Sequence, residues 1–105
     1  MNQERISLLK KYIEETPLDP FPHYALALEL WETDPLETEK LFSRLLQDFK
    51  NYLPTYYMAG LFFSELQKKE RAMEIFEKGI QVAQETHNKK TEEEIRAALS
   101  DLQYG

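Results

Sequence analysis

The sequence predicts an all-helical protein of about six helices, joined as antiparallel helix-turn-helix pairs. The first observation is composition: Leu, Glu, Lys, Ala and Gln favour helix and are abundant, and only three of the 105 residues are glycine. The second is that apolar residues recur three and four positions apart in successive segments. The third is that no segment alternates apolar and polar residues as a half-buried strand would. Together they favour helices packed on one another.

Prolines and polar turns separate the first three segments. Helices are expected over residues 3–15, 21–32 and 35–49. Proline is unfavourable inside a helix but suits a turn or a first helical turn, and all five prolines lie within the first 54 residues of the chain. Asp19 is expected to cap the second helix, and Asp34 the third, with Pro35 at its first position.

Polar turns also separate the last three segments. Helices are expected over residues 54–68, 70–85 and 91–103. Pro54 is expected to mark the start of the fourth helix, and residues 87–90 are expected to form a polar loop before the sixth. Thr91 followed by Glu94 is typical of a capping box, so Thr91 is predicted to be the N-cap of the sixth helix. Its inward residues are predicted to be Ile95, Ala98, Leu99 and Leu102.

An internal repeat links these segments. The later copy reads Tyr56-x-x-Ala59-Gly60-x-x-Phe63 and then Ala72-x-x-x-Phe76, and the earlier copy reads His23-x-x-Leu26-Ala27-x-x-Leu30 and then Thr38-x-x-x-Phe42. The outer segments echo a second helix and a first helix, so the order is B, A-B, A-B, A, where A and B are the first and second helices of a repeat. A period of this length is typical of stacked helical repeats, in which each pair buries its faces against its neighbours.

This pattern resembles the tetratricopeptide repeat family, whose first helix carries Trp-x-x-Leu-Gly-x-x-Tyr and whose second carries Ala-x-x-x-Phe. Residues 56–76 match it with conservative replacements. The resemblance implies a short right-handed solenoid and a single domain over residues 1–105. That domain would comprise capping helices at 1–16 and 91–103 and repeats at 21–50 and 54–86. The proline that usually closes each repeat is absent, since Lys50 and Gln84 stand in its place.

The resemblance also implies a binding surface, because the first helices of this family line a concave face. By register, that face would present Tyr24, Leu28, Trp31, Tyr57, Leu61, Ser64 and Glu65. Such a mostly apolar stripe suits a peptide or helix of a partner protein, as in an adaptor or scaffold. The alternatives are that the stripe is covered by a terminal helix or that it joins two copies in a homodimer. Some members of the family grip an acidic peptide terminus with Lys and Asn, but neither residue type occurs at these positions.

Several other functions are not expected. The net charge of −6 disfavours nucleic acid as a partner. There is no cysteine, no signal-like start and no apolar run long enough for a membrane span, so a cytoplasmic protein is the default expectation. His23 and His87 lack partners at metal-ligand spacing, and His23 is expected to serve packing. No catalytic motif is found, so no enzyme, cofactor or metal site is predicted.

Overall fold

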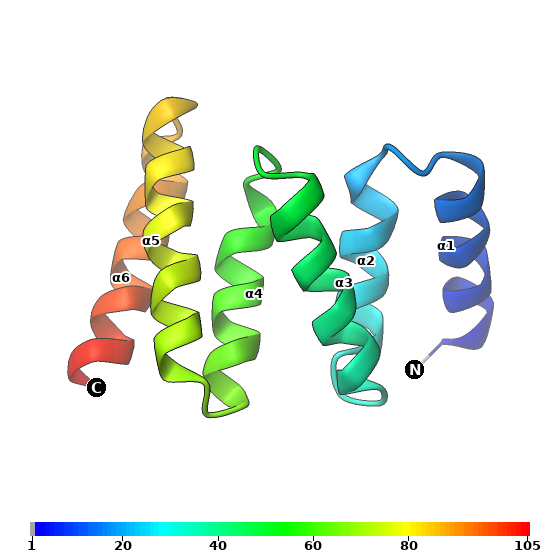
Figure 1. Ribbon diagram of the computed structural model, residues 1–105, viewed down its shortest axis with the longest axis horizontal. Coiled ribbons are helices and arrows are strands. Elements are labelled where there is room, and N and C mark those ends of the chain that lie inside the picture. The colour runs from blue at the N-terminus through cyan, green and yellow to red at the C-terminus, as the bar shows by residue number, and fades with distance from the viewer. Residues whose placement is uncertain (1) are drawn as a thin grey trace. The chain divides into compact units, whose positions relative to one another are not determined.

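The computed structural model describes residues 2–105, which contain six α-helices and no strand (Figure 1). The helices are α1 (Gln3–Glu15), α2 (Pro20–Leu30), α3 (Pro35–Asp48), α4 (Pro54–Glu65), α5 (Lys69–Glu85) and α6 (Lys89–Tyr104). The prediction of an all-helical fold with about six helices is therefore confirmed. The contacts divide the chain into two units, of which the first ends at Tyr52 and the second begins at Leu53.

The first unit consists of α1, α2 and α3, with successive helices running in opposite directions (Figure 1). α2 packs against both α1 and α3. Phe42 and Leu45 of α3 are fully buried, and the buried Thr38 hydroxyl donates a hydrogen bond of 3.1 Å to the carbonyl of Ala27. His23 is buried as predicted, because its ring packs 5.5 Å from that of Phe49.

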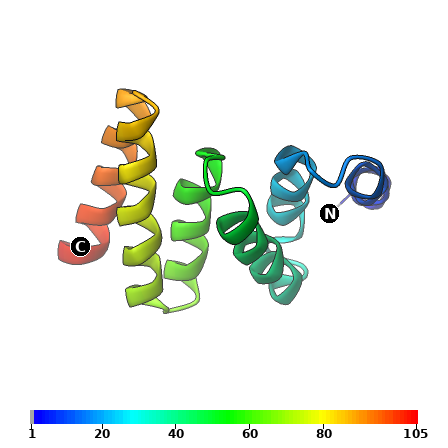
Figure 2. The same ribbon diagram turned by 45° about the horizontal axis from the view of Figure 1, so that its top comes forward.

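The second unit consists of α4, α5 and α6, which Figure 2 shows from a second direction. α5 packs against both other helices, and α4 also contacts α6. Close approach depends on two glycines: a Cβ on Gly60 would overlap the ring of Phe76, and a Cβ on Gly79 would lie 2.5 Å from the Cβ of Tyr56. These two glycines therefore let the large side chains of Phe76 and Tyr56 fill the space beside them.

Polar caps determine where several helices begin. Asp19 accepts a hydrogen bond from the backbone N–H of Phe21, and Asp34 accepts one from Glu37, as predicted. The capping box at Thr91 is wrong, because α6 begins two residues earlier, at Lys89. Asn88 is the N-cap, and its side chain accepts a hydrogen bond of 3.1 Å from the backbone N–H of Thr91.

Two helices end earlier than the pattern of apolar residues suggested. α2 stops at Leu30, and its C-cap Trp31 donates its backbone N–H to the carbonyl of Leu28, three residues back, at 3.4 Å. α4 stops at Glu65, because Gln67 adopts a left-handed backbone with φ of 63°. α2 thus ends two residues, and α4 three residues, before the end that the sequence predicted.

The turns that follow α4 and α5 share one geometry. Gln67 and His87 both have positive φ, at 63° and 56°. In each turn the next N–H reaches back five residues, from Lys68 to Phe63 at 3.0 Å and from Asn88 to Ala83 at 2.8 Å. These are the hydrogen bonds of a Schellman motif, which satisfies carbonyls left unpaired at a helix end.

Candidate partner-binding groove

One face of α4 carries three of the predicted binding residues. Tyr57, Leu61 and Ser64 are spaced by four and three positions, so they form one stripe along the helix. All three line a groove in the second unit with a volume of 380 Å³. The structure therefore brings together the part of the predicted stripe that belongs to α4.

The opposite wall of the groove comes from α6. Its lining residues are Glu94, Ala97, Ala98, Asp101, Leu102 and Gly105. Four of them, from Glu94 to Asp101, follow the spacing of a single helix face. Ala97 and Ala98 contribute small side chains to this wall, and Phe76 of α5 completes the lining.

The groove is apolar along its middle and acidic along α6. Tyr57 is 36% exposed, and Leu61 and Leu102 are half-buried. Glu94 and Asp101 are exposed. No lysine, arginine or histidine is among the lining residues. The surface therefore combines apolar contact area with uncompensated negative charge.

Glu65, the fourth residue predicted on α4, is exposed but does not line this groove. It follows Ser64 directly and is the last residue of α4. One step along a helix turns a side chain by roughly 100°, so neighbours point in different directions. The groove therefore contains three of the four residues that were predicted on α4.

The other three predicted residues lie in the first unit, on or directly after α2. Tyr24 is half-buried and meets the ring of Tyr52 edge-on, with centroids 5.7 Å apart. Trp31 is the C-cap of α2 and meets the buried Phe42 ring edge-on at 5.9 Å. Leu28 is half-buried. Two of these three side chains thus make aromatic contacts within their own unit.

The surroundings of Tyr24 and Tyr52 also affect their protonation. Burial raises the pKa of Tyr24, and the nearby Tyr52 raises it further. Burial also raises the pKa of Tyr52, with a smaller contribution from the negative charge of Asp19. Both rings therefore stay neutral under ordinary conditions and contribute packing surface rather than charge.

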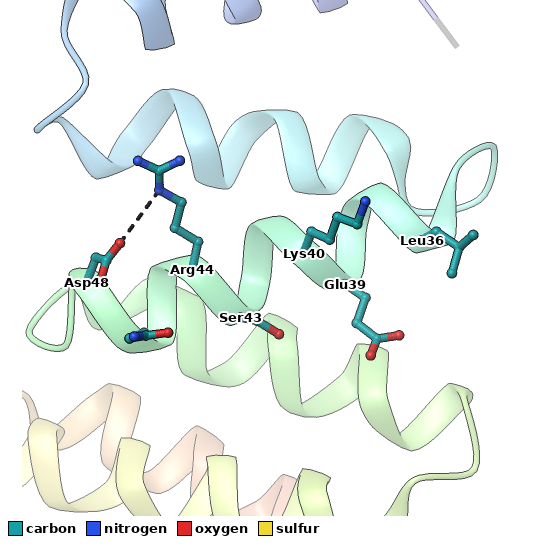
Figure 3. A pocket seen from close by; sticks show the side chains of 7 residues that line it. Leu36, Glu39, Lys40, Ser43, Arg44 and Asp48 are labelled. Carbon is teal, nitrogen blue, oxygen red and sulfur yellow. Dashed lines mark ion pairs between the residues drawn. The ribbon is translucent and has the colours of Figure 1, made fainter.

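A second concavity of 470 Å³ lies along α3 in the first unit (Figure 3). All its lining residues belong to α3, and they include the charged pair Arg44 and Asp48, whose nitrogen and oxygen are 3.6 Å apart. Leu36, at one end, is 75% exposed. Two cationic and two acidic side chains line it, so this surface has no single charge preference.

The described residues 2–105 contain no cluster suited to a metal ion. No group of three or more His, Cys, Asp or Glu side chains in this range is placed to hold a metal ion. His23, the one buried histidine of this range, has its Nε2 3.4 Å from the carbonyl of Pro17. None of the helices described here is long and apolar enough to cross a membrane.

The sequence pattern missed the contribution of α6 to the groove. Ile95, Ala98, Leu99 and Leu102 were all expected to point inward, but only Ile95 is buried. Ala98 and Leu102 are half-buried because they line the groove. The sequence could have indicated this contribution, because its spacing places two acids and two alanines on one face of α6. These residues are Glu94, Ala97, Ala98 and Asp101.

Comparison with known proteins supports the repeat assignment. No protein-family model and no curated protein matches the chain. Among solved structures, the chain is similar to a tetratricopeptide repeat domain protein from Salinibacter ruber. The solution NMR structure matches with 32% identity and a TM-score of 0.76, over 80% of this chain and 86% of that one. The crystal structure matches with 30% identity and a TM-score of 0.77, over 82% and 98%.

Proposed function

The chain belongs to the tetratricopeptide repeat family, and from this we propose that it binds a short segment of another protein in the groove between α4 and α6. The fold of this family is that of a protein-interaction module. The observation that carries the proposal is the groove itself, whose lining includes Tyr57 and Leu61 of α4 and two alanines of α6. Concave surfaces with an apolar lining and a few polar groups are typical binding sites.

A polypeptide is a better partner for this groove than a nucleic acid. Two carboxylates line it, no cationic side chain does, and the whole chain carries a net charge of −6. Phosphate backbones would be repelled by such a surface. A peptide or helix buries apolar side chains in a groove, which is the usual mode by which helical surfaces recognise partners. The proposed role is therefore that of an adaptor or scaffold, without a catalytic step.

The role of Tyr57 provides the test. Peptides are first selected from a phage-displayed library of random 15-residue sequences on the wild-type protein. For the selected peptides, Tyr57→Ala is expected to raise Kd about tenfold, because a partly exposed tyrosine at a groove is a typical energetic anchor. Fluorescence anisotropy measures Kd, and circular dichroism checks that the variant remains helical.

Tyr12→Ala is the matched control. Tyr12 lies on α1 in the other unit and is 43% exposed, so the same truncation removes a similar side chain away from the groove. Peptides that bind Tyr57→Ala as tightly as wild type would contradict the proposal.

Self-association through the same groove is the competing hypothesis. Light scattering over a hundredfold concentration range tests it with wild type and a Tyr57→Ser, Leu61→Ser double variant, in which both substitutions lie in the groove. A monomer at every concentration supports binding to another protein. A wild-type dimer that the double substitution converts to monomer supports a homo-oligomer instead.

A further inference from the structure

The charges along α6 indicate what kind of segment the groove selects. We propose that its partner is a cationic amphipathic segment, in which one or two apolar side chains are flanked by lysine or arginine on both sides. This inference rests on the proposed function, because it specifies the chemistry of the partner that the same groove would bind. Three observations support it: the positions of two carboxylates, the distance between them along α6, and the absence of cationic residues from the groove lining.

The carboxylates bracket the apolar part of the α6 wall. Glu94 and Asp101 are seven residues apart on one helix, so they lie on the same face, roughly 10 Å apart along the axis. Ala97 and Ala98 occupy the face between them. Each carboxylate therefore lies at one end of the pair of alanines on the α6 wall.

Neither carboxylate is neutralised by the protein. No ion pair is formed by Glu94 or Asp101 within residues 2–105. Arg96, the one arginine of α6, points its Nε to Glu92 at 3.0 Å and does not line the groove. The negative potential of the groove is therefore available to a partner, and charge complementarity favours a cationic one.

The size of the groove limits how much of the partner enters it. A volume of 380 Å³ is at the small end for ligand pockets, so it accommodates one or two large side chains and not a whole helix. Tyr57, Leu61 and Leu102 provide apolar contacts for those side chains. The cationic groups would remain at the rim, where Glu94 and Asp101 are exposed to solvent.

This arrangement predicts a spacing in the partner. A helical segment that runs along α6 would carry its two cations seven residues apart, and an extended one would carry them about three residues apart. In both cases the apolar residues fall between the cations. An acidic peptide would place like charges together at both ends of the groove, which is unfavourable.

The experiment tests whether the charge of the groove determines the charge of the peptides that it selects. The random 15-residue library is selected in parallel on wild type and on a Glu94→Lys, Asp101→Lys double variant. Wild type is expected to enrich peptides with Lys or Arg on both sides of apolar residues, and the double variant is expected to enrich acidic flanks instead. For peptides selected on wild type, Kd for the double variant should be about tenfold higher or more. Fluorescence anisotropy at low salt measures Kd for both proteins.

Glu93→Lys is the matched control, because it makes the same change of charge in the first turns of α6, one residue from Glu94 and outside the groove. It should leave Kd within about twofold of wild type, as expected for a solvated charge away from the contact. An equal effect of Glu93→Lys would overturn the inference, since the charge would then act from a distance and not at the groove.

The two proposals fail in distinguishable ways. Enriched peptides that lose affinity with Tyr57→Ala but show no charge preference would overturn the cationic partner and leave the groove as the binding site. Peptides insensitive to Tyr57→Ala would overturn both proposals. A groove-dependent dimer, or the absence of any enriched peptide, would also overturn both.

Discussion

Gly60 leaves no room for a side chain, because the ring of Phe76 occupies the position that a Cβ would take. The buried ring cannot move aside easily, since it is only 1% exposed. Glycine at this point is thus required by the approach of α4 to α5, and not by a turn or an unusual backbone angle. The same residue carries the repeat signature in the sequence, so a motif position corresponds here to a specific contact.

Gly60→Ala tests this contact by the sign of its effect. In an unconstrained helix interior, alanine stabilises by up to about 1 kcal/mol relative to glycine. At residue 60 we expect the opposite, a loss of about 1–3 kcal/mol in the free energy of unfolding, because overpacking forces the ring from its position. Urea denaturation followed by circular dichroism measures the change. An unchanged or increased stability would show that the ring adapts.

At the scale of the helix, the N-terminus of α6 is defined by Asn88 and not by Thr91. The Asn88 side chain accepts from the backbone N–H of Thr91, while Thr91 itself lies inside the helix. Sequence alone favoured Thr91, because Thr followed by Glu three residues later is a common capping pattern. Asn88 and Thr91 both have side chains that can cap a helix, and the sequence alone does not decide between them. The choice depends on the path of the backbone before α6, which the left-handed conformation of His87 determines.

The two caps make different predictions. Asn88→Ala is expected to lower the free energy of unfolding by about 1 kcal/mol, because it removes the acceptor for an unpaired helical N–H. Thr91→Ala should be neutral or slightly stabilising, since alanine is the better helix former at an interior position. Thermal and urea denaturation of both variants provide the comparison. A larger loss for Thr91→Ala would instead place the helix start at residue 91.

At the scale of the whole molecule, the chain divides into two compact units. The helix count, the all-helical class and the repeat could be predicted because they depend on periodicity, which is local in the sequence. The groove was predicted only in part. Tyr57 and Leu61 followed from the register, but Glu94 and Asp101 did not, because their role depends on which side of α6 faces α4.

Local stability should follow the division into units. The close neighbours of Gly60 lie in α5, and those of His23 lie at Pro17 and Phe49, so each residue acts within its own unit. In repeat proteins stability is approximately a sum of local terms. Gly60→Ala should therefore reduce hydrogen-exchange protection more in residues 53–105 than in 2–52, and His23→Ala should do the reverse. Equal losses in both units for both variants would indicate a single cooperative block.

The two turns of shared geometry, at Gln67 and His87, affect which substitutions related chains can accept. Each holds a side-chain-bearing residue in a left-handed conformation, where glycine would be unstrained. Neither turn therefore depends on a particular side chain for its shape, and mutation to glycine, asparagine or aspartate at these points stays compatible with the same hydrogen bonds. Related chains can thus carry different residues at these joints and keep the same helix pairing. Related chains should therefore resemble this one more at the packed positions around Gly60 and Gly79 than in the turns that separate the helices.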